Sequence, residues 1–582
     1  MRRLIIATAV LLAVVVACSS DDESSSSSST TSAPVASSPT DAPAPSTTVA
    51  DGPDATAEIP TNPYLADSVW PATHHDSFQQ ESSEAPGPTD GNVTAQRTVT
   101  PGVPVNVVFS PPYDDGSIVT WTTTSNTPDL RGVIKVDHVT GEIIDTFIPA
   151  ERGLDPPEFV ALLSGNYKML DRDNRLIVGY SSRLEVYGDD FPADPASSIE
   201  LLDTYPLPSD ALCRPDDSLV GLVMTYDGRI AFATDMGMVG FMPGEPSEMS
   251  DEALAVASLN GEKCGDESIP VEELEHVTNS IAADETGGVY AVTDERLLRF
   301  SASGGEVAID WSATYETGDA LSAVRIGDAG SGSTPTVMGT SEGDDRFVVI
   351  TDGQDVMHLV LYWLDEIPAD WEPVEPGKDP RIACEVPVTF GETDVSNSET
   401  EQSVLVHGYS SILTNNRLDD AAGIGELPEN LRRGSAALLG GDPEFAPRGA
   451  ERIDWDPGTR TCSTVWTNTE VSIPNGVPTM SAPSNMVYGM GLDGSTWGLV
   501  GLDFDTGEQV FFAPGAGGEE CKDAQLSQFP DAASSVFEPY FDQLPTSCDN
   551  SFYSSTLVGP DQVIYSGHFG AMTRFVPDDA AD

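Results

Sequence analysis

The sequence predicts an all-β protein that folds as a single β-propeller, with eight blades as the preferred count. Three observations lead to this fold class. Short runs of β-branched and aromatic residues follow tight turns along the chain, as in GSIVTW, RLIVGY and DRFVVIT. These units return at a nearly constant interval. Helical periodicity is weak everywhere, and the best helix candidate, residues 250–259, has the character of a local insertion.

The interval between the units sets the blade count. One residue near the turn of each unit marks its position: Gly116, Asn174, Gly228, Gly288, Asp345, Gln402, Asn485 and Asp561. The first six markers lie 54 to 60 residues apart, and the last two intervals are 83 and 76 residues. An interval of this length fits one four-stranded blade. Eight markers predict eight blades, and the two long intervals leave seven as the alternative.

A second recurring unit is a hairpin. Residues 136–147, 453–466 and 502–512 each contain a strand, a turn with Asp and Gly, and another strand. We expect the glycine of each turn to take a positive φ. The segment SVWPATHHDSFQQES from Ser68, ahead of all these units, is expected to be the strand that closes the ring.

The N-terminal residues predict export. In residues 1–17, Arg2 and Arg3 precede an apolar run, the pattern of a secretory signal peptide. The stretch VVAC resembles the lipobox of bacterial lipoproteins, and the resemblance implies that Cys18 is lipidated on sulfur. A plain secreted protein is the alternative. We expect anchoring by lipid to the outer face of the bacterial cytoplasmic membrane.

The remaining chain divides into two parts. Residues 18–61 are predicted to be the lipidated cysteine and a disordered tether of Ser, Thr and Pro, spanning about 35 Å as a flexible coil. Residues 62–582 form the propeller domain.

The charge limits the partners. The net charge is −67, from 94 acidic and 27 basic residues. Such a field repels nucleic acid and anionic lipid head groups, so neither is expected as a partner. Solubility, or life in a salty habitat, accounts for the charge more simply than an acidic binding function does. Ca²⁺ is the ligand that an acidic surface would suit.

Six cysteines remain besides Cys18. An even number in an oxidising compartment predicts three disulfides. Fifteen pairings are open to six cysteines. Pairing between neighbours in the sequence gives Cys213–Cys264, Cys384–Cys462 and Cys521–Cys548.

Several motifs resemble those of known propellers. The D-x-x-T-G-E hairpins at Asp137 and Asp503, and the opening W-P-x-x-x-x-D at Trp70, are similar to quinoprotein-like propellers, the superfamily of the pyrroloquinoline quinone (PQQ) dehydrogenases. Four stretches, among them NPYLADSVWPATHHDSFQQ and NSIAADETGGVYAVTDERLLRF, resemble a family of secreted bacterial and fungal propellers without an established function. The second resemblance spans residues 62–582 and implies no mechanism.

The resemblance to PQQ dehydrogenases stops short of their cofactor site. Those enzymes carry a disulfide between adjacent cysteines under the cofactor and an acidic calcium site with a catalytic Asp. This chain has no adjacent cysteine pair, and its tryptophans are scattered. The sequence therefore argues against PQQ.

A local resemblance concerns Asn279. The stretch NSIAADETGGVY is similar to the Asn-containing strand of calcium-dependent lactonases and strictosidine synthase-like propellers. This resemblance implies that Asn279 could bind Ca²⁺ beside carboxylates of other blades. A structural Asn is the simpler interpretation.

The histidines offer a second possible site. His276, His358 and His407 lie near predicted inner strands and, with Asn279 and Asp352, are expected to line an axial channel as ligand-binding residues. No two histidines have a metal-ligand spacing, so each is more simply an ordinary strand residue. His74-His75-Asp76 is a further candidate for a metal site.

Together these observations favour binding over catalysis. We expect a surface-anchored lipoprotein whose propeller binds a ligand or partner where the loops of several blades meet. The alternatives are a calcium-dependent lactonase-like hydrolase, a quinoprotein-like oxidoreductase acting on the axial face, and a scaffold for an envelope complex. No catalytic residue is predicted, and the fold alone does not supply a function.

Overall fold

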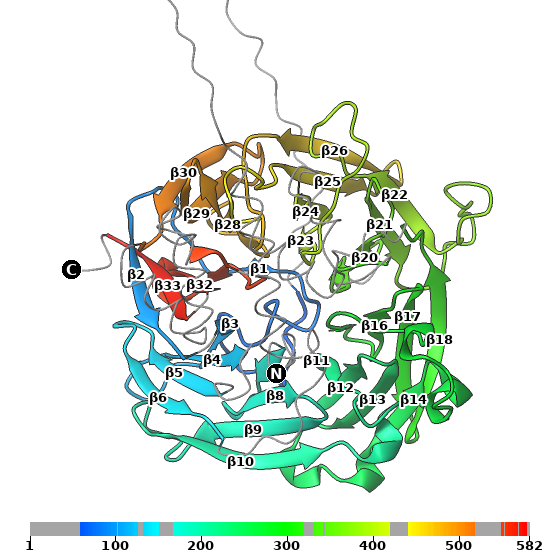
Figure 1. The fold of residues 1–582 in the computed structure, drawn as a ribbon, viewed down its shortest axis with the longest axis horizontal. Helices are drawn as coiled ribbons and strands as arrows, with labels where there is room; N and C mark the ends of the chain where they lie inside the picture. The colour runs from blue at the N-terminus through cyan, green and yellow to red at the C-terminus, as the bar shows by residue number, and fades with distance from the viewer. Residues whose placement is uncertain are drawn as a thin grey trace, which may run out of the picture.

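The described residues form a closed ring of eight blades in a computed structural model of the chain (Figure 1). They are residues 59–101, 103–125, 132–149, 167–318, 330–340, 344–418, 440–517, 549–551, 553–568 and 570–578. Each blade has four antiparallel strands, the first nearest the axis and the last at the rim, and one blade gains a fifth, parallel strand on its inner side. The eight-bladed prediction is confirmed, and among the described residues no helix is long and apolar enough to cross a membrane.

Blades 1 to 4 follow one another along the chain. Their strands are β3 (Val103–Phe109), β4 (Val119–Ser125), β5 (Val133–Asp137) and β6 (Ile143–Phe147) in blade 1; β7 (Lys168–Leu170), β8 (Leu176–Tyr180), β9 (Arg183–Asp189) and β10 (Ile199–Pro206) in blade 2; β11 (Leu219–Met224), β12 (Arg229–Thr234), β13 (Met238–Pro243) and β14 (Ala255–Ser258) in blade 3; and β15 (Ala282–Ala283), β16 (Val289–Val292), β17 (Arg296–Ser303) and β18 (Glu306–Thr314) in blade 4.

Blades 5 to 8 complete the ring. Their strands are β19 (Thr336–Met338), β20 (Phe347–Thr351), β21 (His358–Trp363) and β22 (Ile382–Pro387) in blade 5; β23 (Leu405–His407), β24 (Ser410–Thr414), β25 (Ala450–Asp456) and β26 (Thr461–Asn468) in blade 6; β27 (Thr479–Ser481), β28 (Met486–Asp493), β29 (Thr496–Asp503) and β30 (Gln509–Pro514) in blade 7; and β31 (Leu557–Val558), β32 (Ile564–His568) and β33 (Ala571–Pro577) in blade 8.

The ring is closed by β2 (Val93–Val99), which pairs antiparallel with β33 as the outer strand of blade 8 (Figure 1). The expectation that the segment at Trp70 closes the ring is therefore wrong. An outermost strand keeps much of its surface in solvent, and every described residue of β2 is partly or fully exposed. Trp70 is completely buried, so it belongs inside the ring.

The sequence markers correspond to one position in the blade. Seven of the eight lie in the turn between the first and second strands, as Gly228 does between β11 and β12. Gln402 is the exception, because it precedes β23, and the equivalent turn of blade 6 contains Gly408. Of the three hairpin glycines, Gly141 and Gly507 have positive φ, whereas Arg460 takes that conformation in the hairpin that contains Gly458.

The predicted helix at residues 250–259 is also wrong. The segment contains a 3-10 turn, η4 (Asp251–Ala253), followed by β14, the rim strand of blade 3. Strand β13 supplies the backbone partners, with Phe241 opposite Ala255. Pairing in the sheet overrides the local helix propensity of this alanine-rich stretch.

The hydrophobic core lies between neighbouring blades. Between blades 5 and 6, Phe347 has its ring centroid 4.9 Å from that of Trp363 and 4.8 Å from that of Trp455. Aromatic pairs at such separations add to the energy of burial. The same two blades are joined at the rim by the Cys384–Cys462 disulfide, and Cys213–Cys264 joins two loops of blade 3. Both predicted pairs are confirmed, while Cys521–Cys548 falls outside the described residues.

Candidate functional site

Residues 65–83, which we call the axial strap, follow the inner face of the ring. Figure 1 shows this segment leading to β1 (Ser82–Ser83), which lies at the centre and pairs in parallel with β27. Its polar groups bond in turn to the inner strands or adjoining loops of all eight blades. These contacts pair Trp70 with Phe109, Thr73 with Lys168, Ser77 with Met224 and Ala283, Phe78 with Val337, Gln80 with Val406, and Glu81 with Met480 and Ser555.

The axial strap takes an unusual backbone conformation. His74, His75, Gln79 and Glu81 all have positive φ, with values from 55° to 82°. Non-glycine residues rarely adopt this region, so four within eight residues indicate a path dictated by the surrounding blades. Their side chains show the same constraint, because Glu81 is completely buried and Gln79 is 2% exposed.

The side chains at the centre form a buried polar network. His74 pairs through Nδ1 with Glu81 Oε1, and that oxygen also accepts a hydrogen bond from Ser555 Oγ at 2.9 Å. On its other side, His74 Nε2 lies 3.5 Å from Thr334 Oγ1. Thr334 in turn donates to Asn279 Oδ1 at 2.9 Å. The two adjacent histidines of the sequence thus divide between the network, which contains His74, and a local contact of His75 with Asp76.

Asn279 occupies a structural position in this network. Its Oδ1 accepts hydrogen bonds from the Tyr167 hydroxyl, Thr334 Oγ1 and the Ser280 backbone N–H, and its Nδ2 donates to the Gly332 carbonyl. None of these contacts is with a carboxylate. The carboxylate of Glu81 is connected to Asn279 only through His74 and Thr334.

The predicted ligand residues do not all meet. His276 lies near blade 4, where Nδ1 is 3.4 Å from Asp235 Oδ1 and Nε2 bonds the Val271 carbonyl. Burial lowers its pKa, but the contacts with Asp235 and Val271 outweigh that effect and raise it to about 9. His407 ends β23 and bonds Ser82 Oγ at 2.9 Å. Because strand ends alternate between the two faces of an antiparallel blade, His407 lies on the face opposite the β20–β21 turn.

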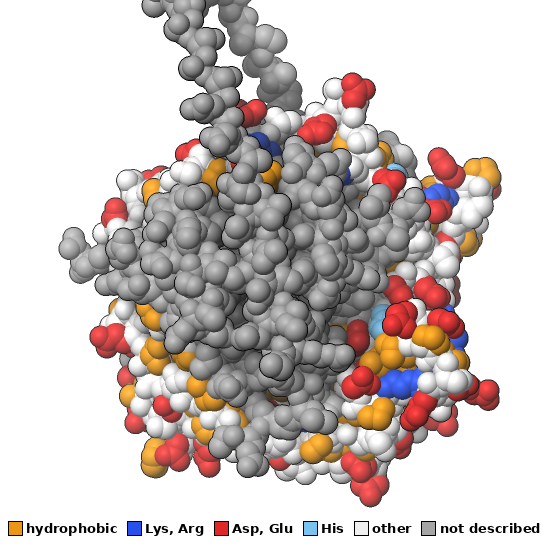
Figure 2. Space-filling view, in the orientation of Figure 1, with side chains coloured by type: hydrophobic (Ala, Val, Ile, Leu, Met, Phe, Trp, Pro, Cys, Tyr) orange, Lys and Arg blue, Asp and Glu red, His pale blue; other side chains and the backbone are white. Residues whose placement is uncertain are grey.

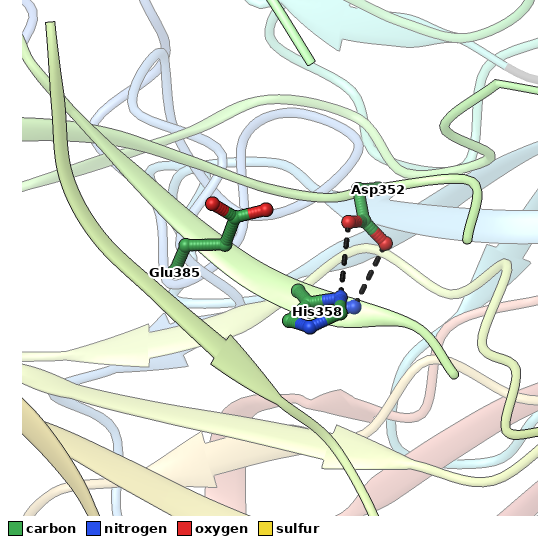
Figure 3. A group of neighbouring side chains, drawn as sticks. All are labelled: Asp352, His358 and Glu385. Atoms are coloured by element: carbon green, nitrogen blue, oxygen red, sulfur yellow. Dashed lines mark hydrogen bonds and ion pairs between the residues drawn. The ribbon is translucent and has the colours of Figure 1, made fainter. Parts of the chain in front are cut away.

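Asp352 and His358 do come together, in the turn between β20 and β21 (Figure 3). Asp352 Oδ1 accepts from the backbone N–H of His358 at 2.8 Å, and the Asp352 N–H donates to the His358 carbonyl at 3.0 Å. A side-chain carboxylate that caps its own turn is typical of Asp in loops. His358 Nδ1 consequently lies 3.1 Å from Asp352 Oδ2.

Glu385 on β22 is the third member of this group, and the sequence analysis missed it. In the register of β21 and β22, His358 faces Pro387 and Val360 faces Glu385. Residues two apart along a strand point to one face, so His358 and Glu385 are diagonal neighbours on that face. We call Asp352, His358 and Glu385 the blade-5 cluster, whose candidate ligand atoms all lie within 4.8 Å of one another. No local spacing in the sequence connects His358 with a residue 27 positions later.

Two further side chains contact the blade-5 cluster. Gln354 Nε2 lies 2.7 Å from Asp352 Oδ2, 3.0 Å from His358 Nδ1 and 3.5 Å from Glu385 Oε1. Lys378 Nζ lies 2.8 Å from Glu385 Oε1 and 3.1 Å from Glu316 Oε1. Burial lowers the Lys378 pKa, but hydrogen bonds to the two glutamates outweigh it and raise the pKa overall.

A pocket of about 430 Å³ lies between the segment that joins blades 5 and 6 and the loops of blade 6. Its lining includes Phe390, Asn415, Arg448 and residues 395–398. One lining residue, Ser398, also bonds the segment between Asp352 and His358, because its N–H donates to the Asp355 carbonyl at 2.8 Å and its Oγ accepts from the Met357 N–H at 3.1 Å. Pocket volumes of this size accommodate small ligands.

The surface that the structure describes is rich in acidic side chains. Figure 2 shows Asp and Glu side chains spread over the described part of one face, with few Lys and Arg among them. A field of this sign attracts cations and repels anions. The blade-5 cluster adds two carboxylates to it, of which Asp352 is fully buried and Glu385 only slightly exposed.

The fold places the chain in the class of eight-bladed β-propellers. The structure resembles the quinohemoprotein alcohol dehydrogenase ADHIIG of Pseudomonas putida HK5, with a TM-score of 0.51 and 12% identity over 88% of this chain and 81% of that one. It also resembles the quinohemoprotein alcohol dehydrogenase of Comamonas testosteroni, with a TM-score of 0.50 and 13% identity over 87% of this chain and 80% of that one. At these identities the likeness concerns the fold alone.

Within that class the chain belongs to a family shared with a protein of Archaeoglobus fulgidus described as uncharacterised. The two sequences are 38% identical over 520 residues, which is 89% of each chain. No family model matches the sequence.

The quinone cofactor of the dehydrogenases does not fit this chain. Both disulfides among the described residues join cysteines far apart in sequence, 51 and 78 positions, and no two cysteines are adjacent in the chain. The inner face of the ring is also engaged by the axial strap, which bonds to all eight blades.

Proposed function

We propose that the protein is an exported, lipid-anchored propeller that binds a ligand or partner without converting it chemically. The binding face is the one that carries the blade-5 cluster and the adjoining pocket. The single observation behind this proposal is the pocket, whose lining residue Ser398 bonds Asp355 and Met357 of the segment between Asp352 and His358. Loops held by a rigid scaffold are the usual place for binding residues.

The axial strap supports a binding role over a catalytic one. Its contacts with every blade hold the ring as one rigid unit and use the polar groups of the centre for structure. The pocket is in contrast lined by both polar and apolar side chains, and Asn415 Nδ2 there bonds the Arg448 carbonyl. A ligand there would meet both a cationic and an amide group.

Export and anchoring belong to the proposal through the signal-like residues 1–17 and Cys18. Replacing Cys18 with Ser is expected to move the protein from the membrane fraction to the soluble envelope fraction. A variant that stays on the membrane after this change would contradict lipid anchoring.

The alternative is an enzyme, a quinoprotein-like oxidoreductase or a calcium-dependent lactonase-like hydrolase. Fold likeness to two quinohemoprotein alcohol dehydrogenases favours the first. For the second, the contacts of Asn279 with Tyr167, Thr334, Ser280 and Gly332 lack the carboxylates that such a calcium site would need.

The test compares native and denatured masses of the full chain, purified in mild detergent from its own membrane. A bound ligand gives a mass excess that Arg448→Glu removes, because this arginine lines the pocket. Arg460→Glu is the matched control, since Arg460 lies in the β25–β26 turn at the other end of the same blade. Alcohol-dependent dye reduction after addition of PQQ and Ca²⁺, or lactone hydrolysis, would overturn the proposal in favour of an enzyme.

A further inference from the structure

The blade-5 cluster has the composition of a metal site, and the sequence alone gave no metal-ligand motif there. Two carboxylates and one imidazole present their ligand atoms within 4.8 Å of one another. They come from a turn and a neighbouring strand that backbone pairing holds in register. We propose that Asp352, His358 and Glu385, together with Gln354, bind a divalent transition-metal ion, with Zn²⁺ as the best-suited probe.

The donor set selects the type of ion. Ca²⁺ and Mg²⁺ are bound by oxygen ligands, usually six or more in total for Ca²⁺. An imidazole with two carboxylates suits Zn²⁺ and its neighbours among the transition metals. The separation of 3.1 Å between His358 Nδ1 and Asp352 Oδ2 is close to that of two ligands on one zinc ion, about 3.3 Å for bonds of about 2 Å.

Gln354 lies where a fourth ligand would stand. Its amide nitrogen is 2.7 Å from Asp352 Oδ2, 3.0 Å from His358 Nδ1 and 3.5 Å from Glu385 Oε1, and these separations are close to the ~3.3 Å between two ligands on one zinc ion. Rotating the amide by half a turn replaces this nitrogen with oxygen, and the two orientations have the same shape. With oxygen inward, Gln354 supplies a fourth ligand, which completes the coordination number common for zinc.

Lys378 competes with the ion for Glu385. Its ammonium group lies 2.8 Å from Glu385 Oε1 and therefore neutralises one of the ligands. The same group lies 3.1 Å from Glu316, whose side chain is more than half exposed, so it has a second carboxylate to pair with when a cation binds. Lys378 is thus a positioning residue that weakens the site, and its removal should tighten metal binding.

The experiment is calorimetric titration of the full chain in detergent with Zn²⁺ and, separately, with Ca²⁺, followed by elemental analysis after dialysis. We expect one Zn²⁺ per chain and an affinity at least about tenfold above that for Ca²⁺. His358→Gln and Glu385→Gln should each weaken Zn²⁺ binding by more than about 100-fold, beyond the effect usual for residues outside the ligand shell. Lys378→Met should strengthen it by about tenfold.

His407→Gln is the matched control, because it removes an imidazole from the opposite face of the neighbouring blade and should leave Zn²⁺ binding unchanged. Circular dichroism establishes that each variant is folded. A folded wild-type chain without stoichiometric Zn²⁺, or binding that survives His358→Gln, overturns the metal site.

This inference rests on the proposed binding face and names a ligand class for it. The two fail separately. A mass excess that depends on Arg448, in a protein that does not bind Zn²⁺, would remove the metal site and keep the binding function. Zn²⁺ binding in a protein that also turns over a lactone or an alcohol would keep the metal site and remove the proposed non-catalytic binding function.

Discussion

The axial strap and the blade-5 cluster both contain histidine and carboxylate side chains, but these side chains differ in burial and in their partners. In the strap, His74 and Glu81 are both buried, and Glu81 also accepts from Ser555. In the cluster, His358 and Glu385 keep part of their surface in solvent. A buried polar pair fixes the path of a segment, whereas a partly exposed group of carboxylate and imidazole side chains is a candidate for binding a ligand. Burial and partners, and not residue type, separate His74 from His358, the histidine proposed to bind metal.

The largest difference between the two regions should appear on losing a carboxylate. Glu81→Ala removes the partner of both His74 and Ser555 in a completely buried place, and it should lower the free energy of unfolding by about 3–5 kcal/mol. Glu385→Gln breaks a partly exposed contact with Lys378 and should cost about 0–1 kcal/mol. Urea unfolding of the Cys18→Ser protein measures both values. Similar costs for the two variants would contradict the division between a structural and a functional region.

Asn279 tests whether the whole centre is structural. Asn279→Ala leaves the Tyr167 and Thr334 hydroxyls without their acceptor, so the free energy of unfolding should fall by about 1–3 kcal/mol. The content of bound Ca²⁺ and Zn²⁺ should stay as in the wild type. Loss of a bound Ca²⁺ ion together with stability would instead assign Asn279 the ligand role that its resemblance to lactonases implies.

The pH dependence of stability should differ between two histidines outside both regions. His276 has a folded pKa of about 9, above its ordinary value of 6.5. Its stabilising contribution is therefore full below pH 6.5 and is lost as the pH rises to 9. His568 has a folded pKa of about 4 because burial lowers it, so its contribution is present above pH 6.5 and is lost as the pH falls to 4.

His276→Asn should flatten the decline of the unfolding free energy between pH 6.5 and 9, by an amount on the order of 1 kcal/mol after allowance for solvent screening. His568→Asn should leave that alkaline limb unchanged. The free energy of unfolding measured at half-unit pH steps distinguishes the two. An alkaline limb that is the same in His276→Asn and the wild type would show that the contact with Asp235 is not formed.

The smallest effect on stability is expected at His358. His358→Gln keeps the backbone hydrogen bonds that close the turn and changes only a partly exposed side chain, so the free energy of unfolding should change by no more than about 0.5 kcal/mol. The melting temperature in the absence of metal measures this. A large loss would place His358 among the structural histidines, beside His74.

The sequence could predict much of the architecture. Turn residues at regular intervals gave the eight blades, and neighbour pairing gave two disulfides that the structure contains. These features depend on local turn chemistry and on contacts within a blade or with the next one. The ring closure could not be predicted, because β2 pairs with β33 across more than 470 residues of sequence. Local patterns carry no information about such a partner.

The candidate site divides in the same way. Asp352 and His358 stand in one turn, so the sequence could single them out together, whereas Glu385 and Lys378 join them only through the register of β21 and β22 and the loop before it. The adjacent residues His74 and His75 formed a candidate metal motif in the sequence. In the structure, His74 is buried in a chain of hydrogen bonds. The sequence by itself determined the repeats, the acidic surface and the signal-like start of the chain. Only the tertiary structure decided which polar side chains are enclosed and which face a pocket, because burial arises from segments that are distant along the chain.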